Sequence, residues 1–116
     1  DYSEAVRWYR KAAEQANASA QFNLGRMYHG GFGVSQGHSE AVLWFRKAAD
    51  QGNAYAHFNL GTACRDGKGV AQDHQKAAHW YRKAADQGLD TAQFFLANTF
   101  FYGEGAAQDY KKAEQW

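Results

Sequence analysis

Three glycine-rich segments have the residue types of a phosphate-binding loop. They read Gly31-Phe32-Gly33-Val34, Gly67-Lys68-Gly69-Val70 and Gly103-Glu104-Gly105-Ala106. A dinucleotide loop must follow a β-strand and open a helix within a βαβ unit, where backbone amides can surround the phosphate. No strand pattern precedes these segments, and they recur at a fixed interval. We therefore interpret them as structural loops and expect no cofactor.

The five histidines could supply imidazole ligands to a metal ion. None of them forms the i, i+4 pair that places two ligands on one helix face. His38 and His74 stand at equivalent positions, which carry tyrosine in other copies, and His57 replaces Gln21 and Gln93. This interchange of residue types predicts surface or edge positions and no metal site.

Cys64 is the single cysteine and the one candidate thiol nucleophile. A catalytic thiol needs a histidine base and a lowered pKa. Cys64 instead replaces a tyrosine of a recurring apolar pattern, which predicts a small buried side chain. The sequence also lacks the Ser-x-x-Lys motif of serine acyl-transfer enzymes. We therefore predict a non-enzymatic protein, and we hold a hydrolase as the least favoured alternative.

The elements that must position these residues repeat every 36 residues. Tryptophan returns at Trp8, Trp44, Trp80 and Trp116, and segment 1–36 matches segment 37–72 at about 21 positions without a gap. Each tryptophan lies on a stripe of alanines, so we expect core packing and not a platform for carbohydrate or nucleic acid. A stack of repeats presents an extended surface, which is typical of proteins that bind other proteins.

Each period contains two apolar patterns at helical spacing. The first, here called the B helix, has apolar residues at offsets 0, 3, 4, 7 and 8, as in Ala5, Trp8, Tyr9, Ala12 and Ala13. The second, the A helix, carries Ala20, Leu24 and Tyr28. Gly25 and Gly61 recur in the middle of A helices, which predicts a close approach between helices.

The sequence predicts one repeat array over residues 1–116, all-α, with about three repeats of antiparallel helix pairs. We expect a B helix over 1–16, A–B pairs over about 18–52 and 54–88, an A helix over about 90–102 and a truncated B helix over 109–116. Asp1, Asp73 and Asp109 stand at N-cap positions. Gly52 and Gly88 can end B helices in the left-handed conformation, for which Asn17 is expected in the first copy.

Composition excludes several classes of partner. The net charge of +1 gives no footprint for nucleic acid or an anionic membrane. No apolar run approaches the roughly 20 residues of a transmembrane helix, so we predict no membrane insertion. A single cysteine leaves the compartment open, and the localisation is unknown. We expect a piece of a longer array whose uncovered ends favour end-to-end self-association, with Trp8 and Trp116 near open edges.

The order of small and aromatic residues is similar to that of the Sel1-like repeat family, a relative of tetratricopeptide repeats. The matching motif is Ala20-x3-Leu24-Gly25-x2-Tyr28-x2-Gly31-x-Gly33-Val34, followed by Ala41-x2-Trp44-Phe45-x-Lys47-Ala48-Ala49-x-Gln51-Gly52. The resemblance covers essentially the whole chain and implies a right-handed α-solenoid used as an adaptor or scaffold. A cysteine-rich bacterial subgroup associated with β-lactam binding carries a cysteine pair per repeat, which this chain lacks.

In tetratricopeptide-type stacks the A helices line a concave groove, so the resemblance implies a protein- or peptide-binding site there. An asparagine before the Leu-Gly pair often binds peptide backbone in such grooves, and Asn23 and Asn59 match it, whereas Phe95 does not. Arg26 and Arg65 would favour a carboxylate. A structural spacer without a specific ligand is the alternative. The groove residues implied are Asn23, Arg26, His29, Tyr55, Asn59, Thr62, Arg65, Asn98, Phe101 and Tyr102.

Overall fold

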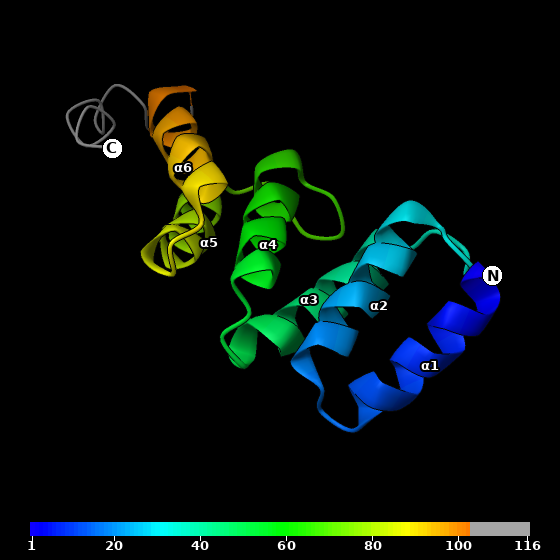
Figure 1. The fold of residues 1–116 in the computed structure, drawn as a ribbon. Helices are drawn as coiled ribbons and strands as arrows, with labels where there is room; N and C mark the ends of the chain where they lie inside the picture. Colours follow the sequence, from blue (N-terminus) through cyan, green and yellow to red (C-terminus); the bar gives the residue numbers. More distant parts are fainter. Residues whose placement is uncertain (103–116) are drawn as a thin grey trace.

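The computed structural model describes residues 1–102 of the chain, with side chains through Asn98. Six antiparallel helices follow one another along an elongated stack (Figure 1). The B helices are α1 (Tyr2–Glu14), α3 (His38–Asp50) and α5 (His74–Asp86), and the A helices are α2 (Ala18–Gly30), α4 (Ala54–Asp66) and α6 (Asp90–Tyr102). The expected B helix over 109–116, with Asp109 and Trp116, lies outside the described residues.

Polar side chains and left-handed residues fix the helix ends. The carboxylates of Asp1 and Asp73 accept hydrogen bonds from the backbone amides of Ser3 (2.8 Å) and Lys76 (3.0 Å), as N-cap residues do. Gly52 and Gly88 take positive φ angles of 89° and 92°. The expectation for Asn17 is wrong, because its neighbour takes the left-handed conformation instead.

Ala16 occupies that left-handed position with a φ of 66°. This leaves Asn17 in an extended conformation, where it caps α2 by accepting a hydrogen bond from the amide of Ala20 at 2.9 Å. Asn53 caps α4 in the same way, through the amide of Ala56. The role of Asn17 therefore follows from the capping hydrogen bond of its side chain, and not from the ability of asparagine to adopt the left-handed conformation.

Glycines in the A helices allow the predicted close approach to the next B helix. A Cβ atom added to Gly25 would lie 2.7 Å from the ring of Phe45, and one added to Gly61 would lie 2.7 Å from the ring of Tyr81. Both distances are shorter than a carbon–carbon contact allows. The two rings are buried, with Phe45 4% and Tyr81 0% exposed, and they form the core with Leu24, Leu60, Leu96 and the B-helix alanines.

The tryptophans are less buried than the alanine stripe predicts. Trp44 packs against the cluster of Val6, Ala13, Ala20 and Leu24, and Trp80 packs against the clusters that follow, but both rings remain partly exposed. Trp8 is 62% exposed. The expectation of a largely buried Trp44 is therefore corrected to partial burial. Because each tryptophan packs onto the preceding repeat, Trp8 has no such neighbour within the described residues.

Successive repeats are joined at both ends of the B helices. At one end, loop glycines with positive φ contact the start of the preceding B helix: a Cβ on Gly33 would lie 2.5 Å from the carbonyl oxygen of Tyr2. Gly69 packs in the same way on the start of α3. At the other end, the amide of Gln51 donates to the carbonyl of Ala16 at 2.8 Å, and Gln87 donates to the carbonyl of Gly52.

Two residues expected at the surface lie inside these joints. Gln21 is 5% and His57 is 6% exposed. The side-chain oxygen of Gln21 accepts a hydrogen bond from Gln51 at 2.9 Å, and Nδ1 of His57 lies 2.8 Å from the side-chain oxygen of Gln87. The prediction from interchange is therefore wrong for His57: glutamine and histidine replace each other because either can pair with the glutamine that ends the next B helix.

Candidate functional site

One cavity of about 590 Å³ lies against the first four helices. The A helices α2 and α4 contribute polar side chains to its wall, and α3 contributes the apolar residues Ala41, Val42 and Phe45. Tyr2 and Tyr9 of α1 and the loop residues Phe32 and Lys68 complete the lining with Met27 and Ala63. An apolar base with polar groups at its margins is the usual composition of a ligand-binding site.

The cavity brings together part of the set predicted from the sequence. Asn23, Arg26 and His29 line it from α2, and Asn59 and Thr62 line it from α4. Three other predicted residues, Tyr55, Arg65 and Asn98, lie outside this lining. Phe101 and Tyr102 belong to α6, but their side chains lie outside the described residues.

Sequence reasoning missed the contribution of the loops and the B helices. Phe32 and Lys68 are the variable residues between the two glycines of successive loops, and both line the cavity. Their variation at equivalent positions, between glycines that do not vary, is the signal by which the sequence could have pointed to them. His38, considered before only as a metal ligand, also lines the cavity, because it stands at the first turn of α3 beside the end of α2.

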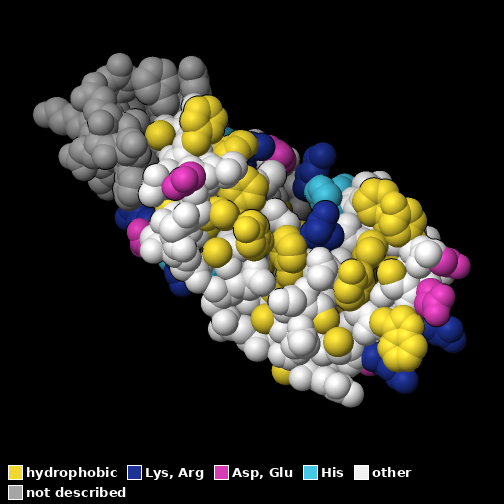
Figure 2. Space-filling model, viewed as in Figure 1, with side chains coloured by type: hydrophobic (Ala, Val, Ile, Leu, Met, Phe, Trp, Pro, Cys, Tyr) yellow, Lys and Arg dark blue, Asp and Glu magenta, His cyan; other side chains and the backbone are white. Residues whose placement is uncertain are grey.

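The polar margin of the cavity is predominantly basic. The rings of His29 and His38 meet edge to face with centroids 5.0 Å apart. Burial lowers the pKa of His29 below its usual value, and the nearby charges of His38 and Lys68 lower it further. Figure 2 shows histidine side chains between basic ones in a hollow of this face, with hydrophobic side chains toward the N-terminal helices.

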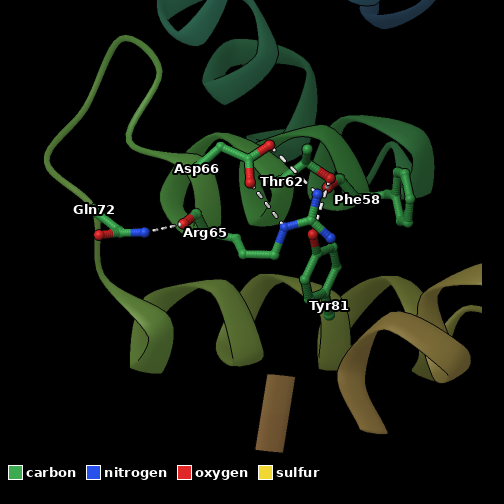
Figure 3. A network of polar contacts seen from close by, with 6 residues as sticks. All are labelled: Phe58, Thr62, Arg65, Asp66, Gln72 and Tyr81. Atoms are coloured by element: carbon green, nitrogen blue, oxygen red, sulfur yellow. Dashed lines mark hydrogen bonds and ion pairs between the residues drawn. The ribbon is translucent and has the colours of Figure 1, made fainter. Parts of the chain in front are cut away.

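The acidic residue of the cavity is already paired. Asp66 accepts hydrogen bonds from the guanidinium of the neighbouring Arg65 at 2.9 and 3.3 Å (Figure 3). This pair raises the pKa of Arg65, and the same guanidinium lies 5.1 Å from the centroid of the Phe95 ring. Arg65 is thus committed to Asp66 and Phe95, which explains why it does not join Arg26 in the cavity.

Three further possibilities considered from the sequence are a reactive thiol, a metal site and a membrane-spanning helix. Cys64 is 5% exposed, and burial raises the pKa of its thiol, which opposes formation of the thiolate. Among the residues that the structure describes, no group of three or more histidine, cysteine, aspartate or glutamate side chains is arranged to hold a metal ion. Within the same part of the chain, no helix has both the length and the apolar character needed to cross a bilayer.

Several solved structures are similar to this chain, among them the following three. A protective antigen of uropathogenic Escherichia coli strains that displays an SLR fold has a TM-score of 0.88 and 41% identity over 99% of this chain and 26% of its own. A Sel1 repeat protein from Oxalobacter formigenes has a TM-score of 0.83 and 38% identity over 97% of this chain and 49% of its own. The chain therefore spans about a quarter and about half of these two proteins.

Helicobacter pylori cysteine-rich protein B is more distant, with a TM-score of 0.74 and 25% identity over 78% of this chain and 68% of its own. No curated protein matches the sequence. These likenesses agree with the six helices in describing an α-helical repeat solenoid.

The repeat pattern itself identifies the family. Sel1 repeats match residues 1–17, 18–53, 54–89 and 90–116, so that each internal match holds one A helix followed by one B helix. Sel1 repeats are known as scaffolds for contacts between proteins. The periodic tryptophans, the glycines beneath the aromatic rings and the glycine loops are thus the shared framework of one family, and the chain belongs to the Sel1 repeat family.

Proposed function

We propose that this chain is a non-enzymatic interaction module that binds an extended peptide, or an exposed segment of a protein, in the cavity between α2 and α4. The observation that carries the proposal is the combination of Asn23 and Asn59 in one cavity with the apolar residues of α3. Asparagine side chains can donate to and accept from a peptide backbone, whereas Phe45 and Met27 can pack against its side chains.

The size of the cavity supports a short segment as the ligand. A volume of about 590 Å³ lies within the range of small-ligand sites and would hold a few residues of a peptide. The lining comes from two repeats, so the binding surface depends on the stacking of the array and not on a single helix pair.

Selection of random peptides on the immobilised chain tests this function. The matched target carries Asn23→Ala and Asn59→Ala, and a second control carries Gln75→Ala on the exposed surface of α5. We expect peptides that bind the unsubstituted chain and the Gln75 variant at least about tenfold more tightly than the double variant, since each lost hydrogen bond to a buried partner costs about 1 kcal/mol. Peptides that do not distinguish the three targets would refute the groove as the site.

A spacer or self-assembling segment is the second candidate, and the exposure of Trp8 favours it. Trp8 is 62% exposed and lies with Arg7, Lys11 and Glu14 around a hollow of about 350 Å³ on α1. Its equivalents Trp44 and Trp80 pack on a preceding repeat. Sedimentation of the chain and of Trp8→Ser over a wide concentration range tests this candidate, because association through this face would disappear in the variant.

A further inference from the structure

The cavity carries a cluster of basic groups that the binding of a peptide backbone does not use. Arg26 and His29 reach it from α2, His38 from the start of α3, and Lys68 from the loop after α4. The one acidic side chain in the lining is Asp66, whose carboxylate is engaged by Arg65. The unpaired charge that faces the cavity is therefore positive.

From this arrangement we infer that the cluster of Arg26, His29, His38 and Lys68, here called the basic seat, binds a carboxylate of an acidic peptide and holds it more tightly as the solution becomes acidic. This inference rests on the proposed function, and it names the chemistry of the partner that the groove would accept.

One ring atom of the basic seat has no hydrogen-bond partner among the described residues. Nδ1 of His38 is the buried side-chain polar atom that has no hydrogen-bond partner among the described residues. Such an atom ordinarily costs free energy unless a partner is supplied. A carboxylate oxygen cannot donate, so it can serve Nδ1 only when that nitrogen carries a proton. The neutral Nδ1–H tautomer of the ring can already donate this hydrogen bond, so a partner for Nδ1 requires no change in the charge of His38.

The direction of the pH effect follows from the groups around His29. His38 faces His29 from α3, and Lys68 faces it from the loop that follows α4. Arg26 lies on the same helix as His29. Tyr2 of α1 and Asp66 of α4, which is paired with Arg65, are the other titratable groups nearby. In the free chain, burial lowers the pKa of His29 most, and its electrostatic interactions with His38 and Lys68 lower it further, so the ring is neutral more often at pH 7 than a free imidazole is.

A bound carboxylate reverses this balance, because an opposite charge favours the imidazolium. Binding is then accompanied by uptake of a proton on His29, and the affinity rises as the pH falls through the range in which this ring becomes protonated. The rise ends near the pKa of the ligand itself, about 4.3 for a glutamate side chain. The tightest binding is thus expected near pH 5–6, with a gain of about fivefold to tenfold over pH 8.

The test repeats the selection from random peptides at pH 5.5 and measures the selected peptides by calorimetry at pH 5.5 and 8.0. Each peptide is synthesised with glutamate or glutamine at every acidic position, and with a free or an amidated C-terminus. These forms distinguish a side-chain carboxylate from the terminal one. We expect enrichment of carboxylates, about tenfold weaker binding by the neutral form, and the stated loss of affinity at pH 8.0.

Three variants assign the effect to the basic seat. His29→Gln should remove most of the pH dependence and leave the affinity at pH 8.0 within about twofold, since the ring is then neutral. Lys68→Gln should weaken binding at both pH values without removing their ratio. Lys76→Gln, an exposed charge outside the cavity, should change neither. Because His29 is exposed, its variant is expected to fold, which circular dichroism checks.

The outcomes separate this inference from the proposed function. Groove-dependent peptides without carboxylates, or equal binding of the glutamate and glutamine forms, would overturn the basic seat while leaving peptide binding in place. Acidic peptides that bind equally well at both pH values would overturn the role of the histidines. If no selected peptide depended on Asn23 and Asn59, the proposed function would fail, and the basic seat would fail with it.

Discussion

Asparagine lines the first inter-repeat groove from both of its A helices, whereas a phenylalanine stands at the matching position of the third A helix, although all are built from the same repeat. Asn23 and Asn59 line the cavity between α2 and α4. The equivalent residue of the next repeat is Phe95, whose ring lies 5.2 Å from that of Phe58 and 5.8 Å from that of Tyr81. One change from asparagine to phenylalanine thus coincides with a change from a polar cavity wall to a cluster of aromatic rings.

The aromatic residue beneath these positions also differs between the repeats. Phe45 and its equivalent Tyr81 are both buried, but Tyr81 adds a hydroxyl that lies 2.9 Å from that of Thr62. Burial raises the pKa of the Tyr81 phenol, as expected for a hydroxyl held in the interior. The repeat framework therefore accommodates asparagine or phenylalanine at one position of the A helix, and phenylalanine or tyrosine at the buried position of the next B helix.

The largest expected effect comes from removing the buried ring beneath the second groove. Tyr81→Ala should lower the free energy of unfolding by about 3–5 kcal/mol, because a fully buried ring is lost. Tyr81→Phe removes only the hydroxyl next to Thr62 and should cost about 1 kcal/mol. Urea unfolding followed by circular dichroism measures both. Similar losses in the two variants would show that the hydroxyl, and not the ring, stabilises this region.

A smaller loss is expected at the partly buried tryptophans. Trp44→Ala should cost about 2–3 kcal/mol, less than a full core truncation, because the ring packs on the preceding repeat with one side in solvent. Trp8→Ala, at an equivalent position that is 62% exposed, should cost less than about 1 kcal/mol. Urea titration of the pair checks the comparison, and equal costs would contradict the idea that each tryptophan acts through the repeat before it.

Phe95→Asn tests directly whether one residue closes the second groove. The variant restores the asparagine found at the two equivalent positions and removes the contacts with Phe58 and Tyr81, at an expected cost of about 1–3 kcal/mol. Phe94→Asn is the matched control, since Phe94 is 65% exposed and should cost less than about 0.5 kcal/mol. Thermal and urea unfolding of the two variants measures the difference in stability. An equal loss in Phe94→Asn would show that the contacts of Phe95 with Phe58 and Tyr81 are not the cause.

The smallest effect in this series concerns binding. Arg26→Glu should weaken a groove-dependent peptide by about tenfold, because it reverses a charge in the cavity. Arg65→Glu should weaken the same peptide by less than about threefold, because Arg65 does not line the cavity and its guanidinium is paired with Asp66. Titration calorimetry compares the two. Equal effects would support the view taken from the sequence alone, that both arginines face one ligand.

The helices were predictable because their signals are local and repeated. Alanine and tryptophan spacing, the cap at Asp73 and the glycines at positions 25 and 61 each act within one helix or between neighbouring helices. Recurrence at 36 residues makes each signal visible several times. The Ala16 turn escaped prediction because the cap formed by Asn17 outweighs the cost of one left-handed alanine.

The site was predictable only in part. The resemblance supplied the positions on α2 and α4, because those follow from the repeat register. The contributions of Phe32, His38 and Lys68 depend on how far the loops and the start of α3 reach over the cavity, which no residue pattern states. Likewise, the withdrawal of Arg65 depends on a contact with Asp66 and Phe95, and Phe95 is 30 residues farther along the chain.

The paired contacts between repeats have a mechanical consequence. Each B helix is held to its predecessor near its start by a loop glycine and at its end by a glutamine, as Gly33 and Gln51 hold α3 to α1. Two attachment points a helix length apart resist rotation about either one, so neighbouring units cannot twist independently. We expect a stack that resists twisting. Its curvature is set by the spacing of these two contacts along the chain, and it fixes the relative orientation of whatever is attached at its two ends.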